Sequence, residues 1–92
     1  MDKAIEAYSK ALKINPDYPE AYNNTGLALQ DQGNLKEAVK SYNKALSIKP
    51  DYADAYNNMG NALKHQKKLD EAMEAYNKSI SIKPDYADTY IN

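Results

Sequence analysis

The chain has 92 residues and contains no cysteine, arginine, phenylalanine or tryptophan. Without cysteine it can form neither a disulfide bond nor a thiolate metal site. Without arginine it lacks the side chain best suited to a bidentate grip on a carboxylate or phosphate. One histidine cannot complete a transition-metal site by itself, so we expect no metal and no other cofactor.

The chain also lacks an excess of either charge and any long apolar run. Its 12 lysines stand against 13 acidic residues, which gives a net charge of -1. That balance provides no electrostatic attraction to nucleic acid or to an anionic membrane. No apolar run exceeds three residues, and the polar N-terminal segment is not a signal peptide. We therefore expect a cytoplasmic protein that binds neither nucleic acid nor membrane.

Catalytic motifs are missing as well. His65 lies in a lysine-rich segment, and no serine has a base at catalytic spacing. No glycine-rich phosphate loop is present. The sequence therefore predicts that the protein is not an enzyme.

What the sequence does contain is an internal repeat of 34 residues. Residues 19–52 recur as residues 53–86, with 20 of 34 positions identical. All nine tyrosines fall in ladders of this step: Tyr8, Tyr42, Tyr76; Tyr18, Tyr52, Tyr86; and Tyr22, Tyr56, Tyr90. Similarity at a fixed period indicates that the fold is an array of repeated units.

Each repeat is expected to consist of two helices joined by a tight turn. Apolar residues close to a 3.6-residue period predict helices over residues 1–15, about 18–32 and about 35–49. Pro16 and Pro50 are expected to end the first and third of these helices.

Capping residues and glycines define the turns within the first copy. Asp17 and Asn34 are expected to be helix N-caps, and Gly33 offers a left-handed turn. Gly26 falls in mid-helix, where glycine costs about 1 kcal/mol relative to alanine. Its recurrence as Gly60 indicates close approach of a neighbouring helix.

The second copy lacks the turn residues of the first. Lys67 and Lys68 stand where Gly33 and Asn34 occur one repeat earlier. The sequence from 54 to 82 contains no proline and only one glycine. It could therefore form either a hairpin or one continuous helix.

The repeated positions resemble the tetratricopeptide repeat family. That family's pattern appears as Tyr22, Thr25, Gly26, Leu29, Ala38, Tyr42 and Pro50, and again as Tyr56, Met59, Gly60, Leu63, Ala72, Tyr76 and Pro84. The resemblance implies an all-α fold, an α-solenoid of antiparallel helix pairs stacked into a superhelix.

Repeat boundaries follow from the same alignment. Residues 1–18 match the second-helix half of a repeat, 19–52 and 53–86 are full repeats, and 87–92 begin a further one. The predicted organisation is a single array over residues 1–92.

The resemblance also implies a protein-interaction scaffold. In this family the first helices of the repeats line a concave groove that binds an extended peptide or a partner helix. The predicted groove residues are Asn23, Asn24, Leu27, Asp31, Asn57, Asn58, Asn61, Lys64, His65 and Asn92. Asn24, Asn58 and Asn92 resemble the asparagine ladder in the repeat domain of O-linked N-acetylglucosamine transferases. The alternative is that these asparagines are solvated, or that they cap or bridge neighbouring units.

A second groove type in the family clamps the two carboxylates of chaperone C-terminal tails. It needs Lys, Asn, Asn, Lys and Arg across three first helices. The corresponding residues here are Asn23, Leu27, Asn58, Asp88 and Asn92. Because every cation is missing, we do not expect a carboxylate clamp.

A self-assembling structural repeat unit is the alternative function. Unpaired terminal helices would allow head-to-tail stacking into a homo-oligomer. A straightened turn at Lys67 and Lys68 would allow a domain swap.

Overall fold

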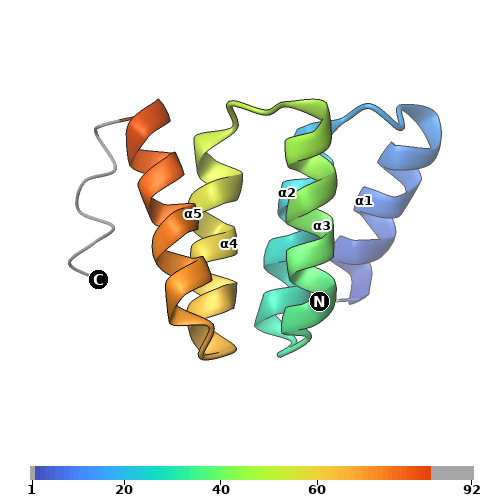
Figure 1. The fold of residues 1–92 in the computed structure, drawn as a ribbon. Coiled ribbons are helices and arrows are strands. Elements are labelled where there is room, and N and C mark those ends of the chain that lie inside the picture. The colour runs from blue at the N-terminus through green and yellow to red at the C-terminus, as the bar shows by residue number, and fades with distance from the viewer. Residues whose placement is uncertain (1, 84–92) are drawn as a thin grey trace.

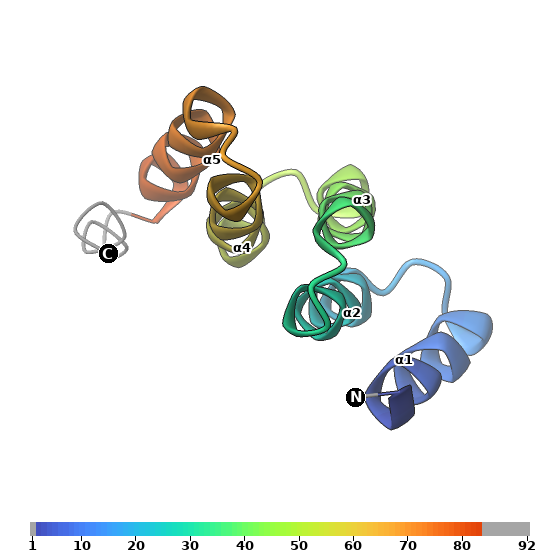
Figure 2. The same ribbon diagram turned by 90° about the horizontal axis from the view of Figure 1, so that it is seen from below.

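The computed structural model describes residues 2–83, which form five α-helices and no strand. The helices are α1 (Asp2–Ile14), α2 (Pro19–Asp31), α3 (Leu35–Ile48), α4 (Ala53–His65) and α5 (Leu69–Ile82). Successive helices contact one another, and α1 and α5 lie at the two ends of the row (Figure 1). Seen end on, α2 and α4 lie on one side of the row and α3 on the other (Figure 2). The predicted all-α solenoid of helix pairs is confirmed.

Both proline stops lie where the sequence predicts them. Helix α1 ends at Ile14, shortly before Pro16, and α3 ends at Ile48, shortly before Pro50. Proline disfavours the helical conformation of the residue before it, so each chain reversal follows from its sequence. The predicted helix start within 87–92 lies outside the described residues.

The predicted N-cap at Asp17 is wrong. Helix α2 begins at Pro19 with Tyr18 as its N-cap, and no side chain caps it. The Asp17 N–H instead donates to Asn15 Oδ1 at 3.2 Å, which keeps Asp17 in the loop. Asn34 is the N-cap residue of α3, but its side chain also makes no capping hydrogen bond.

The second copy forms a hairpin rather than one long helix. Lys67 adopts the left-handed conformation with φ 63°, as Gly33 does with φ 81°. The Lys68 N–H donates to the Leu63 carbonyl at 2.9 Å, and the Lys67 N–H to the Lys64 carbonyl at 2.9 Å. This is the Schellman pattern that ends a helix. The backbone hydrogen bonds therefore form without glycine, and Lys67 adopts a left-handed conformation that is strained for a residue with a side chain.

Each helix pair is held together by a tyrosine ring on a glycine. A Cβ atom on Gly26 would lie 2.4 Å from Cε1 of Tyr42, and one on Gly60 would lie 2.5 Å from Cε1 of Tyr76. Real Cβ atoms do not approach carbon so closely. The close approach predicted from the repeated glycine is confirmed, and the approaching group is an aromatic ring.

Neighbouring repeats meet in a small apolar junction between α3 and α4. Ala45, Leu46, Tyr52 and Ala55 form its buried cluster, with Tyr22, Tyr56 and Met59 packed against it. Tyr52 is 9 % exposed, as expected for a junction residue, whereas Tyr18 at the same repeat position is 41 % exposed.

Replacing Lys67 with glycine should stabilise the protein. A left-handed residue with a side chain costs about 1–2 kcal/mol, and the greater freedom of glycine in the unfolded chain offsets part of this. We expect Lys67→Gly to raise the free energy of unfolding by about 1 kcal/mol in urea denaturation. Lys68→Gly is the matched control, because Lys68 has φ -92° and gains nothing from glycine. Equal effects of the two changes would contradict the strain at Lys67.

High pH should destabilise the fold through its buried tyrosines. Burial raises the pKa of Tyr42, and the charge of Asp31 raises it further; burial also raises the pKa of Tyr76. The folded state thus favours the neutral phenol. This stabilisation is complete below pH about 10, where an unfolded tyrosine titrates, and is lost as pH rises above that value.

The measurement is urea denaturation at a series of pH values between about 9 and 11, spanning the usual tyrosine pKa. We expect the free energy of unfolding to fall above pH about 10. Tyr42→Phe should make that decline shallower, whatever its effect on stability at neutral pH. An identical decline in Tyr42→Phe and the unaltered chain would rule out Tyr42 as a source.

Candidate functional site

The predicted groove residues gather on the first helices of the two repeats. Within the described part of the chain, Asn23, Asn24, Leu27 and Asp31 lie on α2, and Asn57, Asn58, Asn61, Lys64 and His65 lie on α4. Helix α2 contacts α4 directly. The remaining predicted residue, Asn92, lies outside the described residues. We call the surface formed by the residues on α2 and α4 the first-helix surface.

Two of these asparagines bridge the repeats. Asn58 Nδ2 donates to Asn23 Oδ1 at 3.0 Å, and Asn23 is only 6 % exposed. Because a buried amide must be paired to avoid a desolvation penalty, this bond stabilises the stacking of α4 on α2. The structure therefore supports the bridging alternative for this pair.

Asn57 repeats Asn23 one unit later but has no such bond. Its Oδ1 is buried, and within residues 2–83 no hydrogen-bond donor reaches it. Buried polar atoms without a partner are uncommon in folded proteins and each calls for an explanation. Helix α4 thus contains a buried acceptor whose hydrogen bond is not supplied by residues 2–83.

Two further amides are held in place by the core tyrosines. The Tyr76 hydroxyl donates to Asn61 Oδ1 at 2.6 Å, and the Tyr42 hydroxyl donates to Gln30 Oε1 at 2.8 Å. Each bond occupies the amide oxygen and orients the NH₂ group, which carries two donors. Asn57 and Asn61 are four residues apart in α4, so they share one face of the helix.

A shallow hollow lies where α2 and α4 end. It has a volume of about 440 Å³ and is lined by Gln30, Asp31, Gly33, Leu35 and His65. The structure therefore brings together Asp31 and His65, which occupy the same position in successive repeats. Leu27 adds an apolar side chain, 39 % exposed, to the first-helix surface.

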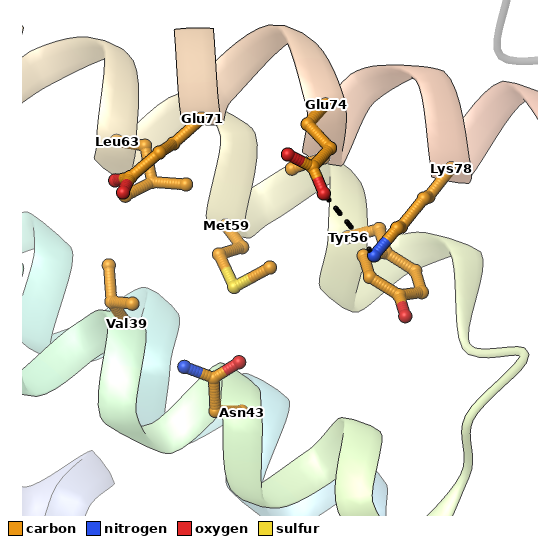
Figure 3. A pocket seen from close by; sticks show the side chains of 9 residues that line it. Val39, Asn43, Tyr56, Met59, Leu63, Glu71, Glu74 and Lys78 are labelled. Carbon is orange, nitrogen blue, oxygen red and sulfur yellow. Dashed lines mark ion pairs between the residues drawn. The ribbon is translucent and has the colours of Figure 1, made fainter. Parts of the chain in front are cut away.

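A second surface, on the opposite side of the row, was not predicted from the sequence. We call it the α3–α5 groove: about 320 Å³ lined by Val39, Asn43, Tyr56, Met59, Leu63, Glu71, Glu74, Ala75 and Lys78. Figure 3 shows side chains of α3 and α5 facing each other across Met59 of α4. The sequence pattern placed Tyr56, Met59 and Leu63 in the core. Tyr56 and Met59 remain half-buried and form the floor of this groove.

Residues 2–83 contain no cluster of three histidine, aspartate or glutamate side chains that could hold a metal ion. None of the helices they form is both long and apolar enough to cross a membrane.

Comparison with known families agrees with the repeat geometry. A family model described as TPR repeat matches residues 1–33 and 26–67, and one described as Tetratricopeptide repeat matches residues 53–86. The chain belongs to the tetratricopeptide repeat family. A search of curated proteins found no match.

Solved structures give the same assignment. The chain is similar to two crystal structures of MamA, each at 31 % identity over 91 % of this chain, with TM-scores of 0.82 and 0.80. It spans 49 % and 46 % of those chains, about half their length. It is also similar to the first TPR of Spaghetti (RPAP3) bound to HSP90 peptide SRMEEVD, at 26 % identity and a TM-score of 0.93, covering 98 % of this chain and 71 % of that one. None of these comparisons tests the predicted ligand-binding residues or the likeness to the transferase asparagine ladder, which therefore stay predictions.

Removing the asparagine bridge should destabilise the stacked repeats. Asn58→Ala leaves the buried Asn23 oxygen without its donor, which costs about 1–3 kcal/mol. A double-mutant cycle with Asn23→Ala, measured by urea denaturation, should give a coupling energy of about 0.5–1.5 kcal/mol. Asn24→Ala, at the same repeat position as Asn58, is the matched control and should cost less than about 0.5 kcal/mol. Additive effects of the Asn23 and Asn58 changes would show that the bond contributes nothing.

Proposed function

We propose that the protein is a non-enzymatic interaction scaffold whose first-helix surface binds an extended peptide. The observation that carries the proposal is the placement of Asn57 and Asn61 on one face of α4. The Asn57 Oδ1 atom is buried and has no donor within residues 2–83, and Asn61 presents an amide whose oxygen is already held by Tyr76. An extended peptide presents N–H and C=O groups in alternation, so its backbone can satisfy both side chains.

Pre-orientation explains why these amides suit a ligand. A side chain that is already ordered loses less conformational freedom when it binds. The tyrosine hydroxyls hold Asn61 and Gln30 from below, so their NH₂ groups need little reordering to donate to a peptide carbonyl. Recognition through backbone groups tolerates many peptide sequences, with Leu27 and the hollow beside His65 adding side-chain contacts.

The RPAP3 structure supports a peptide partner, since a similar repeat array holds SRMEEVD there. We do not expect this chain to recognise the acidic residues of that peptide. Among the described residues at the carboxylate-clamp positions are Asn23, which is buried in the bridge, and Leu27. Neither supplies a cation. Backbone recognition is therefore favoured over recognition of carboxylates.

The test is a titration of the ¹⁵N-labelled chain with SRMEEVD and with a carboxylate-free version in which both glutamates are glutamine, the aspartate is asparagine and the C-terminus is amidated. Both peptides should perturb the NMR signals of α2 and α4 with similar affinity. Asn61→Leu should weaken both by about fivefold, the equivalent of one hydrogen bond. Leucine is the matched choice because Leu27 occupies this position one repeat earlier, so the fold accommodates it.

Two outcomes would overturn the proposal. One is binding of SRMEEVD with no detectable binding of its carboxylate-free version, which would mean that carboxylates are recognised after all. The other is unaltered affinity in Asn61→Leu. Tyr76→Phe separates the two parts of the argument: it keeps the amide but removes the bond that orients it, and we expect a smaller loss of affinity than in Asn61→Leu.

A further inference from the structure

The α3–α5 groove has a counterpart one repeat earlier that is lined largely by equivalent positions. This α1–α3 groove has a volume of about 260 Å³ and is lined by Ser9, Leu12, Tyr22, Thr25, Leu29, Glu37, Lys40, Ser41 and Lys44. Tyr22, Thr25 and Leu29 are the repeat equivalents of Tyr56, Met59 and Leu63 in the α3–α5 groove. Two similar surfaces on one chain therefore allow a direct comparison of their chemistry.

Their charges are opposite. The α3–α5 groove carries Glu71, Glu74 and Lys78, a net charge of -1. The α1–α3 groove carries Glu37, Lys40 and Lys44, a net charge of +1. The difference comes from one position, where Glu74 replaces Lys40.

The charges of the α3–α5 groove are also separated along its length. Lys78 pairs with Glu74 at 3.7 Å, and its ammonium lies 5.6 Å from the centre of the Tyr56 ring. Within residues 2–83, Glu71 forms no ion pair. Figure 3 shows Lys78 beside Tyr56 at one end of the groove and Glu71 beside Leu63 at the other. The Tyr56 end of the groove therefore contains a cation, Lys78, whereas at the Leu63 end the Glu71 carboxylate has no cation paired with it within residues 2–83.

The floor between the two ends is apolar and adaptable. Met59 packs against three buried clusters of the core and is half-buried. Methionine fills irregular space because its side chain is unbranched and polarizable. Val39 and Leu63 complete the apolar wall near Glu71. The α1–α3 groove has the polar Thr25 in place of Met59, and its hydroxyl is bonded to the Ala21 carbonyl at 2.8 Å.

We propose that the α3–α5 groove is a second binding site, which takes a lysine or arginine side chain from a partner polypeptide. The aliphatic stem of the basic residue lies on Met59 and Val39, and its cationic head pairs with Glu71. Such side chains bury their stems on apolar surface while the charged end stays in water. The site is distinct from the first-helix surface and does not depend on its function.

The probe is the peptide acetyl-Gly-Leu-Lys-Leu-Gly-amide, titrated into the full ¹⁵N-labelled chain, with the same peptide carrying glutamate instead of lysine as the ligand control. The lysine peptide should shift the signals of Val39, Met59, Leu63 and Glu71 in a saturable way. The glutamate peptide should leave them in place. Added salt should weaken the binding, since the ion pair is exposed to solvent.

Variants at exposed positions test the charge without threatening the fold. Glu71→Gln should lower the affinity by about threefold, as expected for an exposed ion pair. Glu37→Gln, at the same position in the α1–α3 groove, should change nothing. Glu74→Lys, which copies Lys40 and reverses the net charge of the groove, should lower the affinity at least as much as Glu71→Gln.

Three results would overturn the proposal. Equal shifts from the lysine and glutamate peptides would show that charge does not select the ligand. Unchanged affinity in Glu71→Gln would remove the cation site. Shifts of the groove signals that depend on protein concentration in the absence of peptide would make the groove a contact between copies of this chain.

Discussion

The structure depends on the contact between a tyrosine ring and a glycine backbone within each helix pair. Because Gly26 and Gly60 lack a side chain, the rings of Tyr42 and Tyr76 lie directly on the first helix. Protein interiors are close-packed, so a gap or an added carbon at such a contact changes the spacing of the whole pair. The contact thereby fixes the distance between first and second helices in both repeats.

The same tyrosines connect this packing to the binding surface. Each ring is buried against glycine, while its hydroxyl donates to an amide of the same first helix: Gln30 for Tyr42 and Asn61 for Tyr76. A buried phenol needs a hydrogen-bond partner, and here the partner is a side chain at the proposed site. The glycine positions therefore decide not only how the helices pack but also which amides are oriented at the proposed site.

Much of the fold could be predicted from the sequence because it depends on local chemistry. Proline stops, apolar periodicity and the repeated glycines act within one or two turns of helix, and each lies where the sequence predicts. The Asp17 cap is wrong because Pro19 starts the helix two residues later. The hairpin at Lys67 could not be decided from sequence, since its stability comes from packing of α4 on α5, which outweighs the strain of one residue.

The candidate site was harder to predict because the roles of its asparagines depend on contacts between repeats. Asn23 and Asn57 are equivalent in sequence, yet Asn23 accepts a bond from Asn58, whereas Asn57 Oδ1 has no donor in the described part of the chain. The difference depends on which helix stands beside each asparagine, and a repeat alignment does not contain that information. The α3–α5 groove was missed for a related reason: Tyr56 and Met59 match the family pattern, but both residues are only partly buried.

Repetition of the backbone explains how one short chain can present several different surfaces. Every repeat places a groove between successive second helices. The repeated backbone determines where the groove lies, and a few exposed side chains determine its chemistry. Exposed charges contribute little to folding stability, and the exchange of Glu74 for Lys40 reverses the charge of a groove without altering its frame. The buried amides are constrained in the opposite way, because each must find a partner within the stack or in a ligand. The residues that hold the stack, in the tyrosine–glycine contacts and the asparagine bridge, are therefore different from the exposed charged residues that distinguish one groove from the other.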